Sequence, residues 1–211
     1  MKISYAITVC NEFVEIQKLL LFLKENKRPQ DEIVILFDQR NGDKEVIDWL
    51  IKFNKYPNIQ TWRGYFEGDF ADWKNQLTNY CSGDYIFQLD ADELPHVNLI
   101  TSLPEILKHN PKNEVFLVSR VNTVEGLTEE HINKWRWNVD KRGWVNFPDY
   151  QTRIWKKNEK IKWYGKVHER LIGYNTYTDL PPDEAYALHH PKTIDRQEKQ
   201  NNLYEELQRN R

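Results

Sequence analysis

The amino-acid sequence predicts an α/β protein whose central sheet is mostly parallel and flanked by helices. Short runs of apolar and β-branched residues recur along the first half of the chain, and stretches with helical spacing separate them. The apolar runs do not alternate with polar residues, which is typical of strands that helices cover on both faces. At 211 residues the chain has the size of one compact domain, so we expect a single domain over residues 1–211.

The elements of the first half follow one another in a regular order. Continuous apolar runs predict four strands, at residues 3–9, 32–37, 59–62 and 85–89. Apolar residues three and four apart predict a helix after each of the first three strands, at residues 13–23, 46–53 and 69–81. This order predicts a sheet built from strand–helix units.

The second half is less regular. Past Pro95 the pattern predicts a helix to about His109 and a strand at residues 115–121. Residues 131–164 are rich in Trp, Lys and Arg and show no clear period, and residues 185–188 are expected to form the end of a strand. The last segment, residues 193–211, predicts a charged, solvated helix with Leu203 and Leu207 on one narrow apolar face.

Charge and hydropathy exclude several classes of protein. Thirty Lys and Arg residues against 32 Asp and Glu give a net charge of −2, so there is no basic excess to neutralise nucleic-acid phosphates. The longest apolar run, residues 19–23, is far too short to span a bilayer, and the amino terminus lacks the pattern of a secretory leader. Two cysteines are typical of a reducing compartment. We expect a cytoplasmic protein with no nucleic-acid partner and no membrane span.

Polar clusters follow three of the predicted strands, at residues 10–12, 38–43 and 90–93. Parallel sheets bind ligands beyond the carboxyl ends of their strands, so these clusters are candidate site residues. An Asp-x-Asp pattern such as Asp90 and Asp92 is expected by chance in a chain of this composition, and only its position after a strand is informative. Carboxylates gathered there suit Mg²⁺ or Mn²⁺. A solvated turn that caps the next helix explains the cluster equally well.

Two further segments carry residues with metal-ligand chemistry. His189 and His190 follow the expected strand end, where a neutral imidazole completes a carboxylate site for Mn²⁺; the alternative is that both are structural. His168-Glu169 is the other segment, and here the alternative is that Glu169 is a surface carboxylate paired with Lys166 or Arg170. The sequence contains no zinc spacing, no P-loop and no Gly-x-Gly-x-x-Gly.

The joint order of these motifs resembles the GT-A glycosyltransferases of family 2. The segments that carry the resemblance in the first half are Cys10-Asn11-Glu12, Asp38, Lys74-Asn75, Ser82-Gly83-Asp84-Tyr85 and Asp90-Ala91-Asp92-Glu93. Downstream, residues 150–155, residues 163–169 and His189-His190 resemble the lipopolysaccharide-core-type branch. The chain also resembles the amino-terminal domain of large algal-virus glycosyltransferases that modify a capsid protein. That resemblance implies a fragment of a longer chain with further carboxyl-terminal domains, located in the host cytoplasm.

The resemblance implies a GT-A fold in which about residues 1–94 bind a nucleotide sugar and about residues 95–211 bind the acceptor. It implies a UDP-sugar donor, a glycan or glycoprotein acceptor, an inverting outcome, and Mn²⁺ or Mg²⁺ bridging the donor diphosphate. Carried over by position, the donor-binding residues are Thr8, Asn11, Glu12, Asp38, Lys74 and Asp90. Asp92 then binds the metal directly, Asp90 contacts ribose or metal-bound water, and His189, with His190 beside it, supplies a nitrogen ligand.

The acceptor side is harder to assign. Glu169 is the first candidate for the general base and Asp149 the second, and we expect an aromatic platform for the acceptor sugar from Trp135, Trp137, Trp144, Trp155 and Trp163. The sequence departs from the family in having Asp38-Gln39-Arg40 where Asp-Gly-Ser is common, and it shows no obvious Glu-Asp pair after residue 149. A nucleotidyltransferase that makes the nucleotide sugar, and a non-catalytic, tryptophan-rich carbohydrate-binding module, are the alternative functions.

Overall fold

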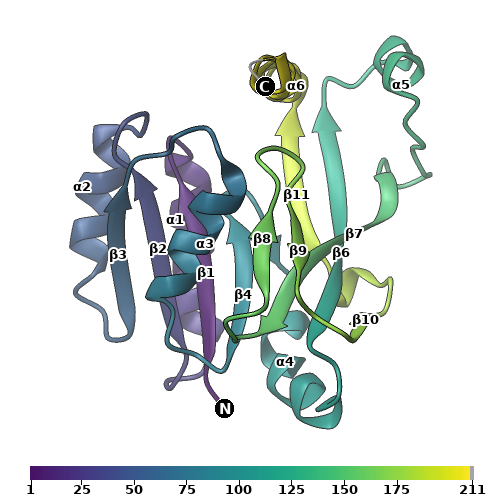
Figure 1. The fold of residues 1–211 in the computed structure, drawn as a ribbon. Helices are drawn as coiled ribbons and strands as arrows, with labels where there is room; N and C mark the ends of the chain where they lie inside the picture. Colours follow the sequence, from purple (N-terminus) through teal and green to yellow (C-terminus); the bar gives the residue numbers. More distant parts are fainter. Residues whose placement is uncertain (210–211) are drawn as a thin grey trace.

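The computed structural model describes the backbone of residues 1–209 and the side chains of residues 1–202 (Figure 1). The expected contacts of Leu203 and Leu207 therefore lie outside the described side chains. Within the described residues the strands are β1 (Ile3–Val9), β2 (Glu32–Asp38), β3 (Ile59–Gly64), β4 (Tyr85–Asp90), β5 (Leu94–Pro95), β6 (Val115–Glu125), β7 (Val145–Lys156), β8 (Lys162–Tyr164), β9 (Arg170–Ile172), β10 (Tyr177–Asp179) and β11 (Leu188–Thr193). The helices are α1 (Phe13–Asn26), α2 (Lys44–Phe53), α3 (Phe70–Tyr80), α4 (Val97–His109), α5 (Glu129–Trp135) and α6 (Ile194–Arg209), with a 3₁₀ turn at Glu184–Tyr186.

The main sheet confirms the predicted α/β class. Its strand order is β3-β2-β1-β4-β7-β6-β11-β5, and β10 adds to β6 outside this path. The first four strands are parallel to one another, β7 runs antiparallel to both of its neighbours, and β11 is again parallel to β6. The four strands predicted from the first half of the sequence form one parallel block, and their carboxyl ends lie at a common edge (Figure 1).

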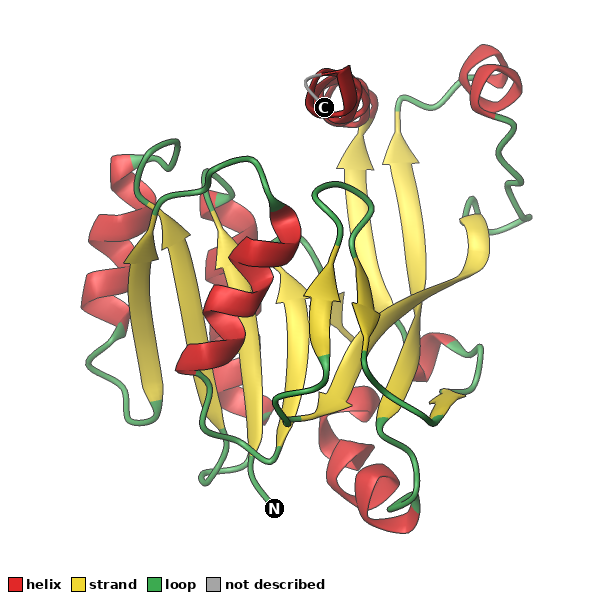
Figure 2. Cartoon of the chain, viewed as in Figure 1, coloured by secondary structure: helices red, strands yellow, loops and turns green. Residues whose placement is uncertain are grey.

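Helices cover both faces of the parallel block (Figure 2). Odd-numbered residues of β1 and β4 pack with the apolar stripes of α1, α2 and α4 in the larger core. Even-numbered residues of the same strands pack with α3 and with the β8–β9 hairpin in a second core. This two-sided burial explains why the strands are apolar throughout.

The second half contains elements that the sequence pattern did not reveal. Residues 131–164, which show no period, contain most of α5 and the twelve-residue strand β7. α5 buries none of its side chains, and β7 carries polar residues on the faces it buries, so neither shows the usual apolar pattern.

The histidines do not end a strand, because residues 184–186 form a 3₁₀ turn and β11 begins at Leu188. His189 and His190 are its second and third residues. In β11 the buried residues His190 and Lys192 alternate with the exposed residues Pro191 and Thr193. Because the buried residues are polar, the strand lacks the apolar pattern from which it could have been predicted. No helix within residues 1–209 is long and apolar enough to span a lipid bilayer.

Candidate functional site

The acidic cluster of residues 90–93 lies at the carboxyl end of β4, as the sequence predicted. Asp90 is the last residue of the strand, and its Oδ2 lies 2.7 Å from Nη2 of the buried Arg153 on β7. Nζ of Lys74, on α3, lies 3.8 Å from the other oxygen. Burial disfavours the charge on Asp90, but these two cations outweigh that effect and hold the pKa of Asp90 well below its ordinary value.

Glu93 closes the turn after β4 and is fully buried. Its Oε1 accepts hydrogen bonds from Arg153 at 2.5 Å and from Arg120 at 3.3 Å, and its Oε2 accepts one from the Asp90 backbone amide at 3.2 Å. Because both carboxylate oxygens accept hydrogen bonds from the protein, Glu93 stabilises the turn and has no oxygen left for a ligand. The roles of Arg153 and Arg120 were not predicted, because β7 and β6, which carry them, are distant in the sequence from residues 90–93.

Asp92 faces a histidine nitrogen across a short gap. Its Oδ2 lies 3.4 Å from Nε2 of His190 on β11 and 3.6 Å from Nη2 of Arg196 in the first turns of α6. Burial disfavours the charge on Asp92, but the His190 contact lowers the pKa of Asp92 to about 2, so the carboxylate is ionised. Of the two histidines, it is therefore His190 that meets the acidic cluster, whereas His189 lies 3.7 Å from Glu184.

The sheet register holds His190 in place. His190 on β11 is the register partner of Asn122 on β6, and Arg120 on β6 is the register partner of Asp149 on β7. Oδ1 of Asn122 lies 2.7 Å from His190 Nδ1, and Nδ2 of Asn122 donates to Asp149 Oδ2 at 2.8 Å. Arg120 donates to the same Asp149 oxygen through Nε and Nη2, at 3.0 and 2.8 Å.

Asp149 is thus held by its neighbours. Gln151 donates to its Oδ1 at 2.8 Å, so both carboxylate oxygens accept hydrogen bonds. Burial disfavours its charge, but Arg120 and the amide donors outweigh burial and lower the pKa of Asp149. A low pKa and occupied lone pairs make a carboxylate a weak base.

Glu169, the other candidate base, lies on the opposite side of Asp90, between β8 and β9. Its Oε1 accepts a hydrogen bond from Lys74 Nζ at 2.6 Å, and its side chain is 15% exposed. The alternative partners named from the sequence, Lys166 and Arg170, are not the ones that the structure gives it. Lys74 consequently bridges Glu169 and Asp90.

The loop after β1 meets the acidic cluster directly. Thr8 is the register partner of Asp90, and Glu12 Oε2 accepts hydrogen bonds from the backbone amides of Cys10 at 2.9 Å and Asn11 at 3.1 Å. Burial and the nearby charge of Asp92 raise the pKa of Glu12. These contacts fold the loop back on itself beside Asp92.

Asp38 organises the loop after β2. Its Oδ1 accepts from the backbone amides of Arg40 at 3.0 Å and Phe66 at 3.3 Å, and its Oδ2 accepts from the Asn41 side chain at 2.8 Å. The side chain is buried. Gly42 permits this compact turn, because a Cβ at that position would approach Phe37 and the Asp38 carbonyl oxygen within 2.4 Å.

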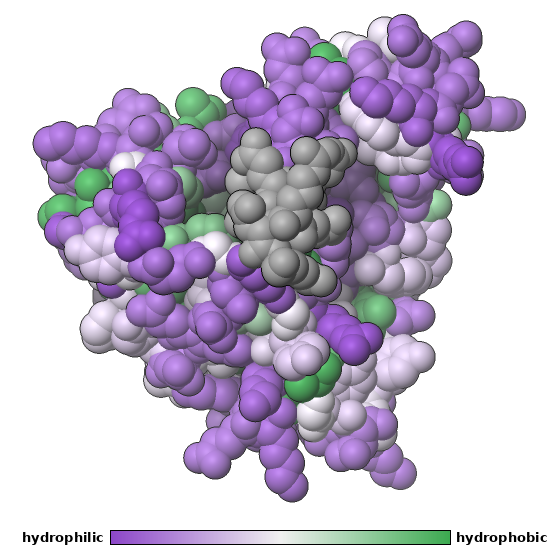
Figure 3. All heavy atoms as spheres, turned by 45° about the horizontal axis from the view of Figure 1, so that its top comes forward, coloured by the Kyte–Doolittle hydropathy of each residue, from purple (hydrophilic) through white to green (hydrophobic). Residues whose placement is uncertain are grey.

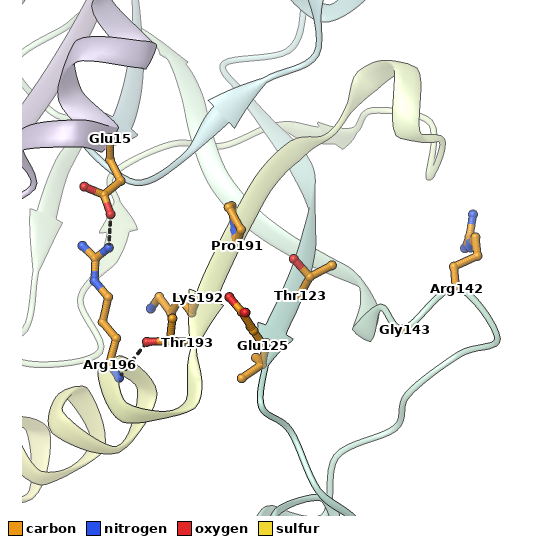
Figure 4. A pocket seen from close by; sticks show the side chains of 10 residues that line it. Glu15, Thr123, Glu125, Arg142, Gly143, Pro191, Lys192, Thr193 and Arg196 are labelled. Carbon is orange, nitrogen blue, oxygen red and sulfur yellow. Dashed lines mark hydrogen bonds and ion pairs between the residues drawn. The ribbon is translucent and has the colours of Figure 1, made fainter.

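A cleft of about 650 Å³ opens beside Arg196 (Figure 4). Its lining includes Glu15, Thr123, Glu125, Arg142, Lys192 and Arg196. Arg196 separates it from the acidic cluster and donates to Glu15 at 2.6 Å. Figure 3 brings the top of Figure 1 forward, where the parallel strands end, and shows a mostly hydrophilic surface. Such a surface suits polar ligands.

The expected aromatic platform is reduced to two residues. Trp155 and Trp163 are buried in the second core, and Trp144 is 7% exposed beneath the Arg142 guanidinium. Trp135 and Trp137 remain partly exposed on the arm that carries α5, with ring centroids 4.7 Å apart. Only this pair has an aromatic face available to a ligand, among the five tryptophans that the sequence suggested.

The residues present fit a divalent cation. Asp92 offers an ionised oxygen and His190 a nitrogen, which suit Mn²⁺ or Mg²⁺ together with substrate oxygens and water. Among the described residues, no third Asp, Glu, His or Cys joins them in a group able to hold a metal. A cation held here would therefore take most of its ligands from a bound substrate and water.

Comparison with known proteins gives both a family and a fold. The profile of Glycosyl transferase family 2 matches residues 4–177. The SPbeta prophage-derived glycosyltransferase SunS of Bacillus subtilis (strain 168) is 26% identical over 176 residues, covering 82% of this chain and 35% of that protein. The glycosyltransferase SunS of Bacillus phage SPbeta gives the same values. The chain thus spans about a third of the length of the curated relatives it matches.

Among solved structures, S. aureus TarS 1–349 in complex with UDP-GlcNAc matches with a TM-score of 0.66 and 16% identity, over 91% of this chain and 59% of that chain. The same protein in complex with UDP matches with a TM-score of 0.65 and 15% identity, over 90% of this chain and 60% of that chain. At these identities the likeness shows the fold, and it confirms the GT-A architecture expected from the sequence.

Proposed function

Because this chain belongs to Glycosyl transferase family 2, we propose that it transfers a sugar from a UDP-sugar donor to a hydroxyl group of a glycan or glycoprotein acceptor. The observation that carries the proposal is the facing pair of Asp92 and His190 beside the acidic end of β4. An oxygen donor and a nitrogen donor 3.4 Å apart, next to ionised Asp90, suit a divalent cation with a diphosphate.

Donor recognition is assigned to the loops after β1 and β2. Thr8, Asn11 and Glu12 line the first loop, and Asp38 organises the second, so the base and ribose would lie between them. Asp90 is already neutralised by Arg153 and Lys74, which favours a contact with ribose or with water rather than with the metal itself.

Asp92 and His190 are the residues that would hold Mn²⁺ or Mg²⁺. A divalent ion acts as a Lewis acid that stabilises the negative charge on a departing diphosphate. His189 is the weaker candidate ligand, because it faces Glu184, 3.7 Å away, and not the acidic cluster. The protein thus contributes two ligands, one from each half of the chain.

Glu169 is the better candidate for the general base. Among the described residues its hydrogen bonding reaches Oε1 only, so Oε2 is available to an acceptor hydroxyl. General-base assistance is worth roughly 10²- to 10⁴-fold in rate. Direct attack by the activated hydroxyl on the anomeric carbon, with departure of UDP, inverts the configuration.

The cleft beside Arg196 is the proposed entry for the acceptor. Arg196, which lines it, lies 3.6 Å from Asp92 and 3.7 Å from Glu12, so the cleft adjoins the acidic cluster. Its carboxylate, hydroxyl and guanidinium groups suit hydrogen bonding to sugar hydroxyls. Trp135 and Trp137, on the arm that carries α5, would add an aromatic face for a sugar ring.

Calorimetry with UDP, GDP and CMP, each with and without Mn²⁺, tests this function. We expect UDP to bind most tightly and to need the metal, because the ionised acidic cluster repels a bare diphosphate. Equal affinity for the three nucleotides, or none, would refute the UDP assignment. Glycan binding that needs neither nucleotide nor metal would instead indicate a carbohydrate-binding module.

A further inference from the structure

Hydrogen bonds link Asp149 to Asn122 and Asn122 to His190, and they determine which ring nitrogen of His190 carries a hydrogen. The carboxylate of Asp149 only accepts hydrogen bonds, so the group of Asn122 that faces it must be the amide nitrogen, Nδ2. The amide oxygen of Asn122 must then face His190 Nδ1, 2.7 Å away. Because that oxygen cannot donate, Nδ1 carries a hydrogen, and Nε2 is the ring nitrogen that faces Asp92.

This arrangement points a ring nitrogen at a carboxylate oxygen. Nε2 of His190 and Oδ2 of Asp92 are 3.4 Å apart. A metal cation bound by both atoms would take the place of a hydrogen on Nε2. Metal-binding histidines commonly donate their other ring N–H to an oxygen acceptor, which fixes the tautomer and the orientation of the ring.

We propose that Asp149 is a positioning residue that acts through Asn122 to hold His190 as the nitrogen ligand of the metal at Asp92. The inference rests on the proposed function and goes beyond it, because it removes Asp149 from the candidate bases. Asp149 reaches Asn122 with an oxygen that also accepts two hydrogen bonds from Arg120, so its position is fixed. All three members of the relay lie on the register-paired strands β7, β6 and β11, which keeps the geometry rigid.

Three variants test the relay. Asn122→Leu removes both hydrogen bonds at nearly constant size. Asp149→Asn keeps an oxygen that accepts from Asn122 and Arg120 and removes the basic carboxylate; its amide nitrogen then faces Gln151. Gln151→Leu is the matched control, since Gln151 contacts the other oxygen of Asp149 and stands outside the relay.

The measurements are the affinity for Mn²⁺ in the presence of UDP, by calorimetry, and the nitrogen coupling to bound Mn²⁺, by pulsed electron paramagnetic resonance. We expect Asn122→Leu to weaken Mn²⁺ about 10- to 100-fold and to lose the coupling. Asp149→Asn should keep the wild-type affinity within a few-fold, because Asn122 keeps its acceptor, and Gln151→Leu should also keep it.

A folded Asn122→Leu protein that binds Mn²⁺ as tightly as the wild type overturns the inference. If that variant does not fold, the wild-type spectrum still decides, because absence of a nitrogen coupling excludes the histidine ligand. Loss of transfer in Asp149→Asn with Mn²⁺ affinity and coupling intact would return Asp149 to the role of base. Failure of the wild type to bind UDP with any divalent metal would instead refute the proposed function.

Discussion

The two ends of the central sheet each carry a buried acidic cluster, and the clusters differ in how far the protein satisfies them. At the amino end, both oxygens of Glu32 accept hydrogen bonds of 2.6 to 2.8 Å from Lys2, Ser4 and Ser82. At the carboxyl end, the contacts of Asp92 with His190 and Arg196 are 3.4 and 3.6 Å long. The side chain of Glu32 is 3% exposed, against 14% for Asp92. Saturated carboxylates stabilise the fold, whereas the incompletely satisfied one is available to a ligand.

The largest expected effect is at the carboxyl end. Asp92→Ala should abolish metal-dependent UDP binding and lower the melting temperature without ligand by less than Glu32→Gln does, because the contacts of Asp92 with His190 and Arg196 are long. Thermal melting with and without UDP and Mn²⁺ measures both effects, with exposed Asp72→Ala as the control. Full ligand-induced stabilisation of the Asp92 variant would show that it is not a ligand.

Glu169→Gln should retain donor binding and lower the rate of transfer by roughly 10²- to 10⁴-fold, because it keeps the shape and the Lys74 contact but removes the basic oxygen. Single-turnover assays with a competent acceptor, paired with UDP calorimetry, separate the two steps. Wild-type transfer rates in this variant would exclude Glu169 as the base.

Glu32→Gln should lower the free energy of unfolding by about 1 to 3 kcal/mol, because a buried, fully hydrogen-bonded carboxylate loses its charge-assisted partners. Urea denaturation measures the change, and UDP binding should persist in the folded variant. If this variant is as stable as the wild type while Asp92→Ala is not, Glu32 is not the carboxylate that stabilises the fold, and the contrast between the two ends of the sheet is wrong.

The smallest expected effect is the loss of the stabilisation by Glu32 at acidic pH. Burial raises the pKa of Glu32, but hydrogen bonds from Lys2, Ser4 and Ser82 outweigh it and lower the pKa to about 2, from an ordinary value of 4.5. Because the folded pKa is the lower one, this stabilisation is present above pH 4.5 and is lost as the pH falls toward 2. The difference in stability between wild type and Glu32→Gln should therefore shrink between pH 5 and pH 3, and a constant difference would contradict the assignment.

The predictable part of the fold is the part whose burial is two-sided. β1, β2 and β4 are apolar throughout because helices cover both of their faces, and the sequence predicted them within a residue or two. β7 was not predicted, because its middle carries Asp149, Gln151 and Arg153, which take part in the polar cluster. A strand that supplies a site loses the apolar pattern that would reveal it.

The residues of the candidate site likewise fall into a predictable group and an unpredictable one. Its acidic residues were found because they follow a strand in the sequence, and that order is local. Arg153, Arg120 and Asn122 were missed because each meets its partner through strand pairing across many residues. The misplacement of the histidines has a related cause, since the inward face of β11 is polar at His190 and Lys192.

The antiparallel strand β7 also limits how such a chain can be inherited or recombined. It crosses between β4 and β6 and delivers Arg153 to Asp90 and Glu93, while Lys74 on α3 reaches across to Glu169. Separating one member of a buried ion pair from the other typically costs about 3 to 5 kcal/mol. A chimera joined near residue 94 would thus inherit acids without their cations unless both halves came from matching parents, so we expect the two halves to evolve as one unit.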